Sequence, residues 1–313
     1  MATESTQRAM CSPIAKRPSP SMVRTKVDGD REKRGWYLLH EIRTDSGDTL
    51  IVGSFGVWRG TDNGATKVEL RKREISAEQR DALRARLAED RKRADQARAA
   101  EAERAARRAQ SLWSKLAPSG DSAYLERKGV GAYGLRFSPK SGAAVVPVCD
   151  AGGRIHGLQI LRPSGSDRQP AKQFWPTGMV KRGHFHLFGG SPVMMVLVAE
   201  GYATGATLHA ATGYPVAVAF DAGNLAPVCQ ALRKRYKGAK ILICADDDSF
   251  SEGNPGITAA STSAVACDGA WVAPTWSPDT QAQREARAAK GDKLTDFNDL
   301  QHLEGLAAVR AQI

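Results

Sequence analysis

Residues 241–250 read ILICADDDSF, a short apolar run that leads into three adjacent aspartates, Asp246, Asp247 and Asp248. Three like charges at the end of one strand repel one another unless a positive group lies among them. This stretch alone leaves two interpretations open, a solvated turn or a site for a metal ion. The sequence on either side of it decides between them.

The surrounding sequence alternates short apolar runs with helix-like segments. Apolar runs at 193–200, 214–220, 240–247 and 270–276 predict strands, and the segments between them predict helices. Because these runs are apolar throughout, each strand should be covered on both faces, as in a parallel sheet. Ligands of open α/β sheets bind at the carboxyl ends of such strands. The three aspartates therefore lie where a ligand site is expected.

Further acidic residues follow the same pattern. Glu200 ends the run at 193–200, directly before Gly201. Asp246 and Asp248 are two residues apart and should project to one side, with Asp247 pointing away. The segment TDFNDL adds a third group after the last predicted strand, Asp296, Asn298 and Asp299. Carboxylates that converge from separate strand ends need a cation, and oxygen ligands in this number suit Mg²⁺ or Mn²⁺.

Composition restricts the classes of partner. The chain has 313 residues and a formal net charge of +11, and most of the basic excess lies within residues 1–140. This asymmetry favours a polyanionic partner such as nucleic acid, although a basic head that only improves solubility is the alternative. Five scattered cysteines without a Cys-x-x-Cys pair predict reduced thiols in a cytoplasmic protein and no zinc site. No apolar stretch is long enough to span a membrane, so no membrane partner is expected.

Five segments are expected along the chain. Residues 1–33 predict a disordered basic arm, and residues 34–74, which alternate apolar residues around DSGD, a small β module. Residues 75–110 contain no Gly or Pro after Ser76, a suitable N-cap, and predict a long charged helix. Residues 111–190 predict a basic α+β subdomain, and residues 191–313 the alternating α/β domain.

These motifs, in this order, resemble the TOPRIM fold shared by bacterial primases, type IA and II topoisomerases and some nucleases. A strand that ends in Glu-Gly, a later Asp-x-Asp and a trailing Asp cluster carry the resemblance. The segments AEGYATGATLHAATG, VAFDAGNL and TDFNDL are typical of TOPRIM primases of plasmids, phages and integrative elements. Upstream, YLERKGV, VPVCDAGGRIHGLQILRPSG and AKQFWPTGMVKRGHFHLFG are similar to the basic subdomain that precedes TOPRIM in bacterial primases. The resemblance covers roughly residues 34–310 and implies a TOPRIM-like, mostly parallel sheet flanked by helices.

Carried over residue by residue, the resemblance implies a set of site residues. The candidate catalytic residues are Glu200, Asp246 and Asp248. The candidate metal ligands are the same three acids and Asp296, with Asn298 and Asp299 as supporting ligands. Gly201 would keep side-chain bulk away from the site. Lys172 matches a lysine of the basic subdomain, and Lys181 or Arg182 matches its next basic position. These would face nucleotide phosphates or the template, with Arg127 and Arg162 as weaker candidates for the same basic wall.

The function that the resemblance implies is that of a DNA primase of a plasmid, phage or other mobile element. Such a nucleotidyltransferase makes short RNA primers on single-stranded DNA from ribonucleoside triphosphates. Two or more Mg²⁺ or Mn²⁺ ions would activate the hydroxyl and stabilise the attacking and leaving oxygens. Glu200 as a general acid or base is left open. No Gly-x-x-x-x-Gly-Lys-Ser/Thr phosphate loop is present, so no fused helicase is expected. A separate replicative helicase is a candidate partner that the resemblance suggests. A metal-dependent nuclease and a non-catalytic DNA-binding replication accessory are the alternatives.

Overall fold

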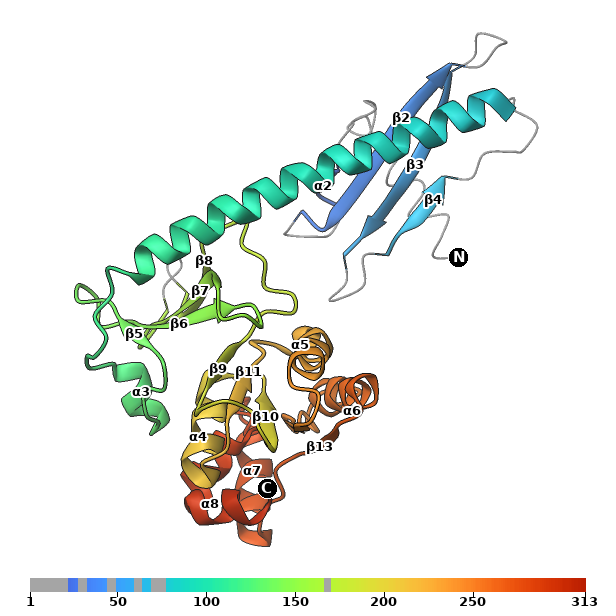
Figure 1. Cartoon of the computed structure of the whole chain (residues 1–313). Helices are drawn as coiled ribbons and strands as arrows, with labels where there is room; N and C mark the ends of the chain where they lie inside the picture. The colour runs from blue at the N-terminus through green and yellow to red at the C-terminus, as the bar shows by residue number, and fades with distance from the viewer. Residues whose placement is uncertain (1–21, 28–32, 44–48, 59–63, 69–76, 166–169) are drawn as a thin grey trace. The chain divides into compact units, whose positions relative to one another are not determined.

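The computed structural model describes residues 22–27, 33–43, 49–58, 64–68, 77–165 and 170–313 (Figure 1). Most of the expected basic arm, and Ser76, lie outside these ranges. The chain divides into two compact units, Met1–Ala99 and Ala100–Ile313. No helix in the described ranges has the length and apolar character needed to cross a membrane. The boundaries of the five expected segments stay a prediction.

The first unit contains a small antiparallel sheet. Its strands are β1 (Val23–Thr25), β2 (Gly35–Arg43), β3 (Thr49–Val57) and β4 (Thr66–Val68), in the order β1-β2-β3-β4. The rings of Trp36 and Tyr37, consecutive residues of β2, are both buried. Gly53 has a φ of 149°, and a Cβ there would lie 1.9 Å from the carbonyl oxygen of Leu38 on the paired strand. Only glycine fits this close approach.

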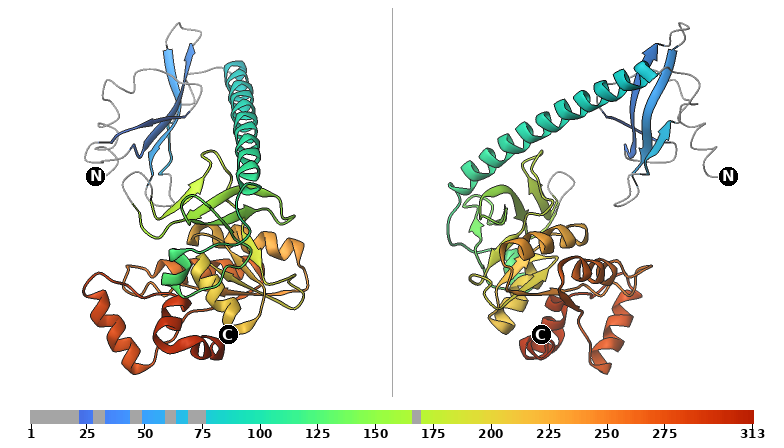
Figure 2. Two further views of the ribbon diagram at one scale, coloured as in Figure 1. Left: turned by 90° about the vertical axis from the view of Figure 1, so that its left-hand side faces the viewer. Right: turned by 45° about the vertical axis from the view of Figure 1, so that its right-hand side comes forward.

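The long charged helix expected from residue 75 onward is α2 (Ala77–Trp113). Figure 2 shows it as a single uninterrupted helix. Pairs one turn apart line its exposed side, such as Arg93 with Glu89 at 2.6 Å and Arg107 with Glu103 at 3.3 Å. Its final turns belong to the second unit.

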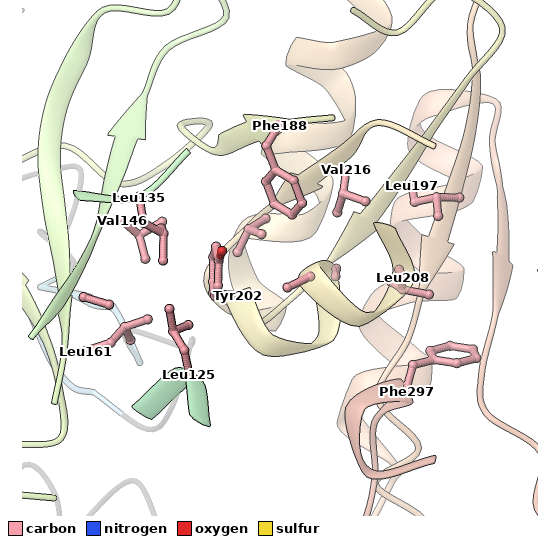
Figure 3. Packing of buried hydrophobic residues seen from close by; sticks show 14 of the residues in the cluster. Leu125, Leu135, Val146, Leu161, Phe188, Leu197, Tyr202, Leu208, Val216 and Phe297 are labelled. Carbon is pink, nitrogen blue, oxygen red and sulfur yellow. The ribbon is translucent and has the colours of Figure 1, made fainter. Parts of the chain in front are cut away.

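The second unit begins with an antiparallel sheet. Its strands are β5 (Arg136–Phe137), β6 (Ala144–Cys149), β7 (Ile155–Leu161) and β8 (Lys172–Trp175), in the order β5-β6-β7-β8, with α3 (Ala123–Lys128) preceding them. Val145 and Leu158 pack against Ala109 near the end of α2. Val146 and Leu161 face the opposite side and join the main core of the unit (Figure 3). Both faces of this sheet are therefore covered.

A five-stranded sheet follows. Its strands are β9 (His186–Phe188), β10 (Met195–Ala199), β11 (Val216–Val218), β12 (Lys240–Cys244) and β13 (Ala270–Val272). The order is β13-β12-β10-β11-β9, and the four strands from β10 to β13 are parallel while β9 runs antiparallel at one edge. The mostly parallel sheet expected from the sequence is confirmed.

Helices cover both faces of this sheet. One face packs against α4 (Tyr202–Thr212) and α8 (Phe297–Ala311), and the other against α5 (Ala222–Arg235) and α6 (Pro255–Cys267). Successive strand residues alternate between the two cores, so that Leu197 contacts the first and Val198 the second (Figure 3). This double cover explains why the strands are apolar throughout. The sequence did not predict α7 (Pro278–Ala288), although Ser277 and Pro278 form an N-terminal helix signal.

Strand order distinguishes one end of the five-stranded sheet as a candidate ligand site. The chain passes from β10 to β11 on one side, whereas β12 pairs with β10 on the other side. This reversal makes a topological switch point between β10 and β12, where ligands of open α/β sheets bind at the carboxyl ends. Ala199 pairs with Cys244, so Glu200 and Asp246 follow adjacent strand ends at this point.

Candidate metal and nucleotide site

Glu200 lies between β10 and α4, next to the N-cap residue Gly201. The backbone of Ala222, the first residue of α5, hydrogen-bonds to its carboxylate, while Oε1 is buried without a partner. Burial, followed by the negative charges of Asp248 and Asp221, raises the pKa of Glu200 to about 7. A carboxylate with this pKa exists in both protonation states near neutral pH.

Asp246 and Asp248 follow β12 at the same edge. Oδ1 of Asp246 is buried without a partner. Burial raises the pKa of Asp246 well above its usual range, and the charges of Asp296 and Glu200 raise it further. Oδ2 of Asp248 accepts a hydrogen bond of 3.2 Å from the backbone N–H of Gly256, near the start of α6. The acids from the two strand ends therefore act on one another electrostatically, as the sequence predicted.

The aspartate between them has a different environment. Oδ2 of Asp247 forms an ion pair of 2.7 Å with Arg284, and Oδ1 accepts a hydrogen bond of 2.9 Å from Asn254. This agrees with the expected alternation along the chain.

Arg284 of α7 was not identified from the sequence, yet it holds two parts of the site together. It is 2% exposed, and its guanidinium lies over the rings of Phe250 and Trp276, 4.7 and 5.1 Å from their centroids. Its Nη2 donates to the carbonyl oxygen of Asp247 and its Nε to that of Leu294, both at 2.7 Å. One side chain thus connects the aspartate loop to the segment that precedes α8.

Asp296 and Asp299 form a capping box at the start of α8. Oδ1 of Asp296 accepts the backbone N–H groups of Asn298 and Asp299 at 2.8 and 2.9 Å, and Oδ2 accepts the hydroxyl of Thr204 at 3.0 Å. Asp299 in turn accepts the N–H of Thr295 at 2.9 Å. Burial, and then the charge of Asp296, raises the pKa of Asp299. Both carboxylates therefore begin a helix and also contribute negative charge at the site.

Asn298 packs in the interior. Its side chain is fully buried, and its amide nitrogen donates to the carbonyl oxygen of Lys128 at 2.8 Å and to the hydroxyl of Thr207 at 3.1 Å. These bonds connect α8 to α3 and α4. Oδ1 remains buried without a partner. Its role as a supporting ligand stays a prediction.

Two glycines near the acids differ in whether a side chain at their position would clash with neighbouring atoms. A Cβ on Gly201 would meet only the hydroxyl oxygen of Thr204, at an ordinary contact distance of 3.5 Å. The packing of the chain itself therefore does not require glycine there, and the expected role of Gly201 in keeping side-chain bulk away from a bound ligand stays a prediction. A Cβ on Gly256 would lie 2.2 Å from the carbonyl oxygen of Asp246. Any side chain at position 256 would therefore clash with the backbone of Asp246. The sequence feature that could have identified Gly256 is its position directly after Pro255 at the start of a helix.

The residues fit a divalent cation that also binds water and substrate. Glu200, Asp246 and Asp248 form no ion pair with any described residue, and Glu200 and Asp246 each have a buried carboxylate oxygen without a partner. Within the described ranges, no three His, Cys, Asp or Glu side chains enclose a metal ion by themselves. Mg²⁺ typically keeps several waters and binds through one or two carboxylates together with substrate phosphates. An open acidic site of this kind suits Mg²⁺ better than zinc.

Of the basic candidates, Lys181 lies next to the acids. Its ammonium pairs with Oδ2 of Asp221 and is 5.1 Å from the ring centroid of Phe174. Asp221 follows β11 and its charge contributes to the raised pKa of Glu200. The sequence segment VAFDAGNL contains Asp221, but the sequence analysis did not assign it to the site. The amide of Asn224 donates to the carbonyl oxygen of Lys181 at 3.2 Å and helps to fix this lysine's backbone.

The other basic candidates divide into two groups. Lys172, at the start of β8, and Arg182 are exposed, and no described residue pairs with the side chain of either. Arg127 and Arg162 instead donate to backbone carbonyl oxygens, Arg127 to Pro163 and Arg162 to Pro170 at 3.0 Å. These two arginines hold both ends of one loop. Their contact with nucleic acid stays a prediction.

The part of the chain that carries this site is similar to a known protein family. A family model for the Toprim domain matches residues 195–270, which run from the start of β10 to the start of β13. The chain contains a Toprim domain. Glu200, Asp246 and Asp248 lie within the Toprim domain, whereas Asp296, Asn298 and Asp299 follow the matched residues.

Similarity extends beyond the Toprim domain. The chain is homologous to the DNA primase TraC of Escherichia coli, with 30% identity over 272 residues, which is 83% of this chain and 24% of that protein. A second E. coli protein, also DNA primase TraC, is 29% identical over 268 residues, 82% of this chain and 18% of the relative. The chain thus spans about a quarter or less of the length of these relatives.

Two solved structures are similar to part of this chain. The catalytic domain of DnaG primase bound to single-stranded DNA is 16% identical, with a TM-score of 0.44, covering 68% of this chain and 79% of that one. The primase fragment of the bacteriophage T7 primase-helicase protein is 16% identical, with a TM-score of 0.39, covering 61% and 69%.

Proposed function

We propose that this chain is the catalytic region of a DNA primase, a nucleotidyltransferase that synthesises short RNA primers on single-stranded DNA. The observation that carries the proposal is the convergence of Glu200, Asp246 and Asp248 at a switch point, without cationic partners among the described residues. The Toprim domain and the similarity to DNA primase TraC along most of the chain support it. The motifs of the sequence favour a mobile element as the origin of its template.

Primer synthesis joins the 3′-hydroxyl of one nucleotide to the α-phosphate of the next and releases pyrophosphate. Two bound Mg²⁺ or Mn²⁺ ions would supply activation of the hydroxyl and stabilisation of the attacking and leaving oxygens. Glu200, Asp246 and Asp248 would hold these ions, and Asp296 and Asp299 would add negative charge behind them. In the alternative role, Glu200 would hold no ion and would act as a general base, because its raised pKa of about 7 suits it to take up the proton of the hydroxyl.

Basic residues would hold the polyanionic substrates. Lys172 and Arg182 are exposed, and we assign them to phosphates of the template or of the incoming ribonucleoside triphosphate. Lys181 is neutralised by Asp221, so it would exchange this carboxylate for a phosphate oxygen when substrate binds. Arg127 and Arg162, which donate to the carbonyl oxygens of Pro163 and Pro170, would exchange these bonds for phosphates of the template.

The first test is a primer-synthesis assay. The purified chain is incubated with a single-stranded DNA template, labelled ribonucleotides and Mg²⁺ or Mn²⁺, beside the variant Asp246→Ala. New oligoribonucleotides are expected from the wild type. The variant should lose about 100-fold or more of this activity, since the charge stabilisation that a metal ion supplies is worth several kcal/mol. Glu252→Gln, which neutralises an exposed carboxylate of the same loop, should retain it.

The same assay separates the alternatives. A shortened template that depends on Asp246 would identify a metal-dependent nuclease. Template binding with neither synthesis nor cleavage would identify a non-catalytic replication accessory. Addition of a replicative helicase tests for that partner, because a functional interaction should raise the rate of primer synthesis on a long template.

A further inference from the structure

Phe174 is an exposed aromatic residue beside the acidic site. It lies on β8, and 36% of its surface is exposed. Its ring packs against that of Phe220 at a right angle, with 5.7 Å between the centroids. A single exposed apolar side chain is ordinary on a protein surface. The residues around Phe174 distinguish it from such side chains.

The contact with Phe220 comes from an unusual backbone. Phe220 has a φ of +76°, in the left-handed region that bulky residues rarely adopt. This residue directly precedes Asp221, whose charge acts on Glu200. Such conformations persist where the surrounding structure imposes them, and they occur preferentially at functional sites. The backbone conformation of Phe220 therefore places its ring against that of Phe174 and also positions the next residue, Asp221, near Glu200.

Basic groups flank the same ring. The ammonium of Lys181 is 5.1 Å from the centroid of Phe174 and pairs with Asp221. Lys172 is two residues before Phe174 on β8, so the two side chains project to the same face, and both are exposed. An aromatic ring between two lysines, next to carboxylates suited to metal binding, matches the chemistry of a nucleotide, which combines a base with phosphates.

We propose that Phe174 is a stacking residue that binds one nucleobase while Lys172 and Lys181 bind the adjoining phosphates. Stacking on aromatic side chains contributes about 1–3 kcal/mol per base and tolerates any base, because every base has a π-face. The base comes either from single-stranded DNA or from an incoming ribonucleotide. The inference rests on the proposed function for its location beside the acids, but it can be measured without catalysis.

The test measures binding in EDTA, where no synthesis takes place. A fluorescent oligothymidylate is compared with an abasic oligonucleotide of equal length, which keeps the phosphates and lacks the bases. Phe174→Ala should weaken binding of the base-containing strand by about 5- to 150-fold, which corresponds to the loss of one stacked base. Binding of the abasic strand should not change. Phe174→Leu, which retains apolar packing against Phe220, should show a similar selective loss.

Two further variants complete the experiment. Phe174→Trp should keep full binding, and its fluorescence should be quenched when the base-containing strand binds. Tyr214→Ala is the matched control, because Tyr214 is 41% exposed but precedes β11, at the amino end of the parallel strands, and binding should be unaffected. A second series replaces the oligonucleotide with a ribonucleoside triphosphate and Mg²⁺. A selective loss there assigns Phe174 to the incoming nucleotide, and a selective loss with DNA assigns it to the template.

Wild-type affinity of Phe174→Ala for oligothymidylate and for the ribonucleotide would overturn the proposal. Equal losses with base-containing and abasic strands would also overturn it, because the ring would then act through folding or charge. If Phe174→Ala shows the base-dependent loss of binding while the wild type makes no primers, the stacking role stands and the primase activity is rejected. If the wild type makes primers and Phe174→Ala binds the base-containing strand as tightly as the wild type, the primase activity stands and the stacking role is rejected.

Discussion

The burial of the Asp246 carboxylate among other acids lowers the stability of the metal-free fold. Its carboxylate is buried near Glu200, Asp248, Asp296 and Asp299, whose charges all raise its pKa. One of its oxygens has no hydrogen-bond partner. Without a cation, this arrangement costs free energy that an uncharged side chain would not cost. We therefore expect Asp246 to serve ligand binding rather than folding.

Replacing Asp246 with Asn should therefore stabilise the metal-free protein. We expect the free energy of unfolding in urea, measured in EDTA, to rise by roughly 0.5–2 kcal/mol, as is common when a functional site is neutralised. Primer synthesis should be lost in the same variant. The exposed control Glu252→Gln should change neither quantity. A clear loss of stability in Asp246→Asn would mean that a partner already compensates the carboxylate.

At the scale of elements, α7 supports the site through Arg284. This guanidinium binds the aspartate loop through Asp247 and binds the carbonyl oxygen of Leu294, two residues before the start of the α8 capping box. The backbone N–H of Asp247 also donates to the carbonyl oxygen of Thr295 at 2.8 Å. These contacts hold the aspartate loop after β12 against the start of α8, although the two segments are about fifty residues apart in the chain.

Removal of this guanidinium should affect both stability and metal use. Arg284→Ala should lower the free energy of unfolding by roughly 3 kcal/mol, because the half-buried Asp247 would lose its charged partner and the carbonyl oxygens of Asp247 and Leu294 would lose their donors. Arg284→Lys keeps the charge but lacks the several fixed donors. The lysine variant should fold and require a higher Mg²⁺ concentration for half-maximal synthesis. If its Mg²⁺ dependence equals that of the wild type, Arg284 is purely structural.

The matched control is on the same helix. Arg287 forms an exposed ion pair of 2.6 Å with Asp292. Exposed pairs contribute about 0–1 kcal/mol, so Arg287→Ala should remain within that range and should leave the Mg²⁺ dependence unchanged.

For the whole molecule, the raised pKa of Glu200 connects stability to pH. Between about pH 4.5 and pH 7 the native state binds more protons at Glu200 than the unfolded state does. The free energy of unfolding contributed by this group therefore falls as the pH rises through that window, and it is constant above it. A bound cation has the opposite effect, because it binds the deprotonated site and stabilises the native state more strongly at higher pH.

The measurement compares the melting temperature of the wild type with that of Glu200→Gln at pH 5, 6 and 8. In EDTA, the wild type should lose stability relative to the variant as the pH rises. In Mg²⁺, the difference should shrink or reverse at pH 8. A difference that does not depend on pH in EDTA would show that Glu200 titrates with an ordinary pKa.

The sequence by itself determined the parallel sheet with helices on both faces and the strand ends that carry Glu200, Asp246 and Asp248. These features are local: an apolar run, a turn signal and the two-residue alternation of a strand are each read from a few neighbouring residues. The capping pair Asp296 and Asp299 was also found in this way, although its role in starting α8 was not.

Only the tertiary structure showed that Asp221 neutralises Lys181, that Arg284 binds Asp247, and that Gly256 lies against Asp246. Each of these contacts joins side chains or backbone groups from different elements, and no local pattern specifies which elements will meet. A lysine, an arginine or a glycine has the same letter whether it faces substrate, a carboxylate or a neighbouring backbone. Its partner is set by packing, which depends on the whole core at once.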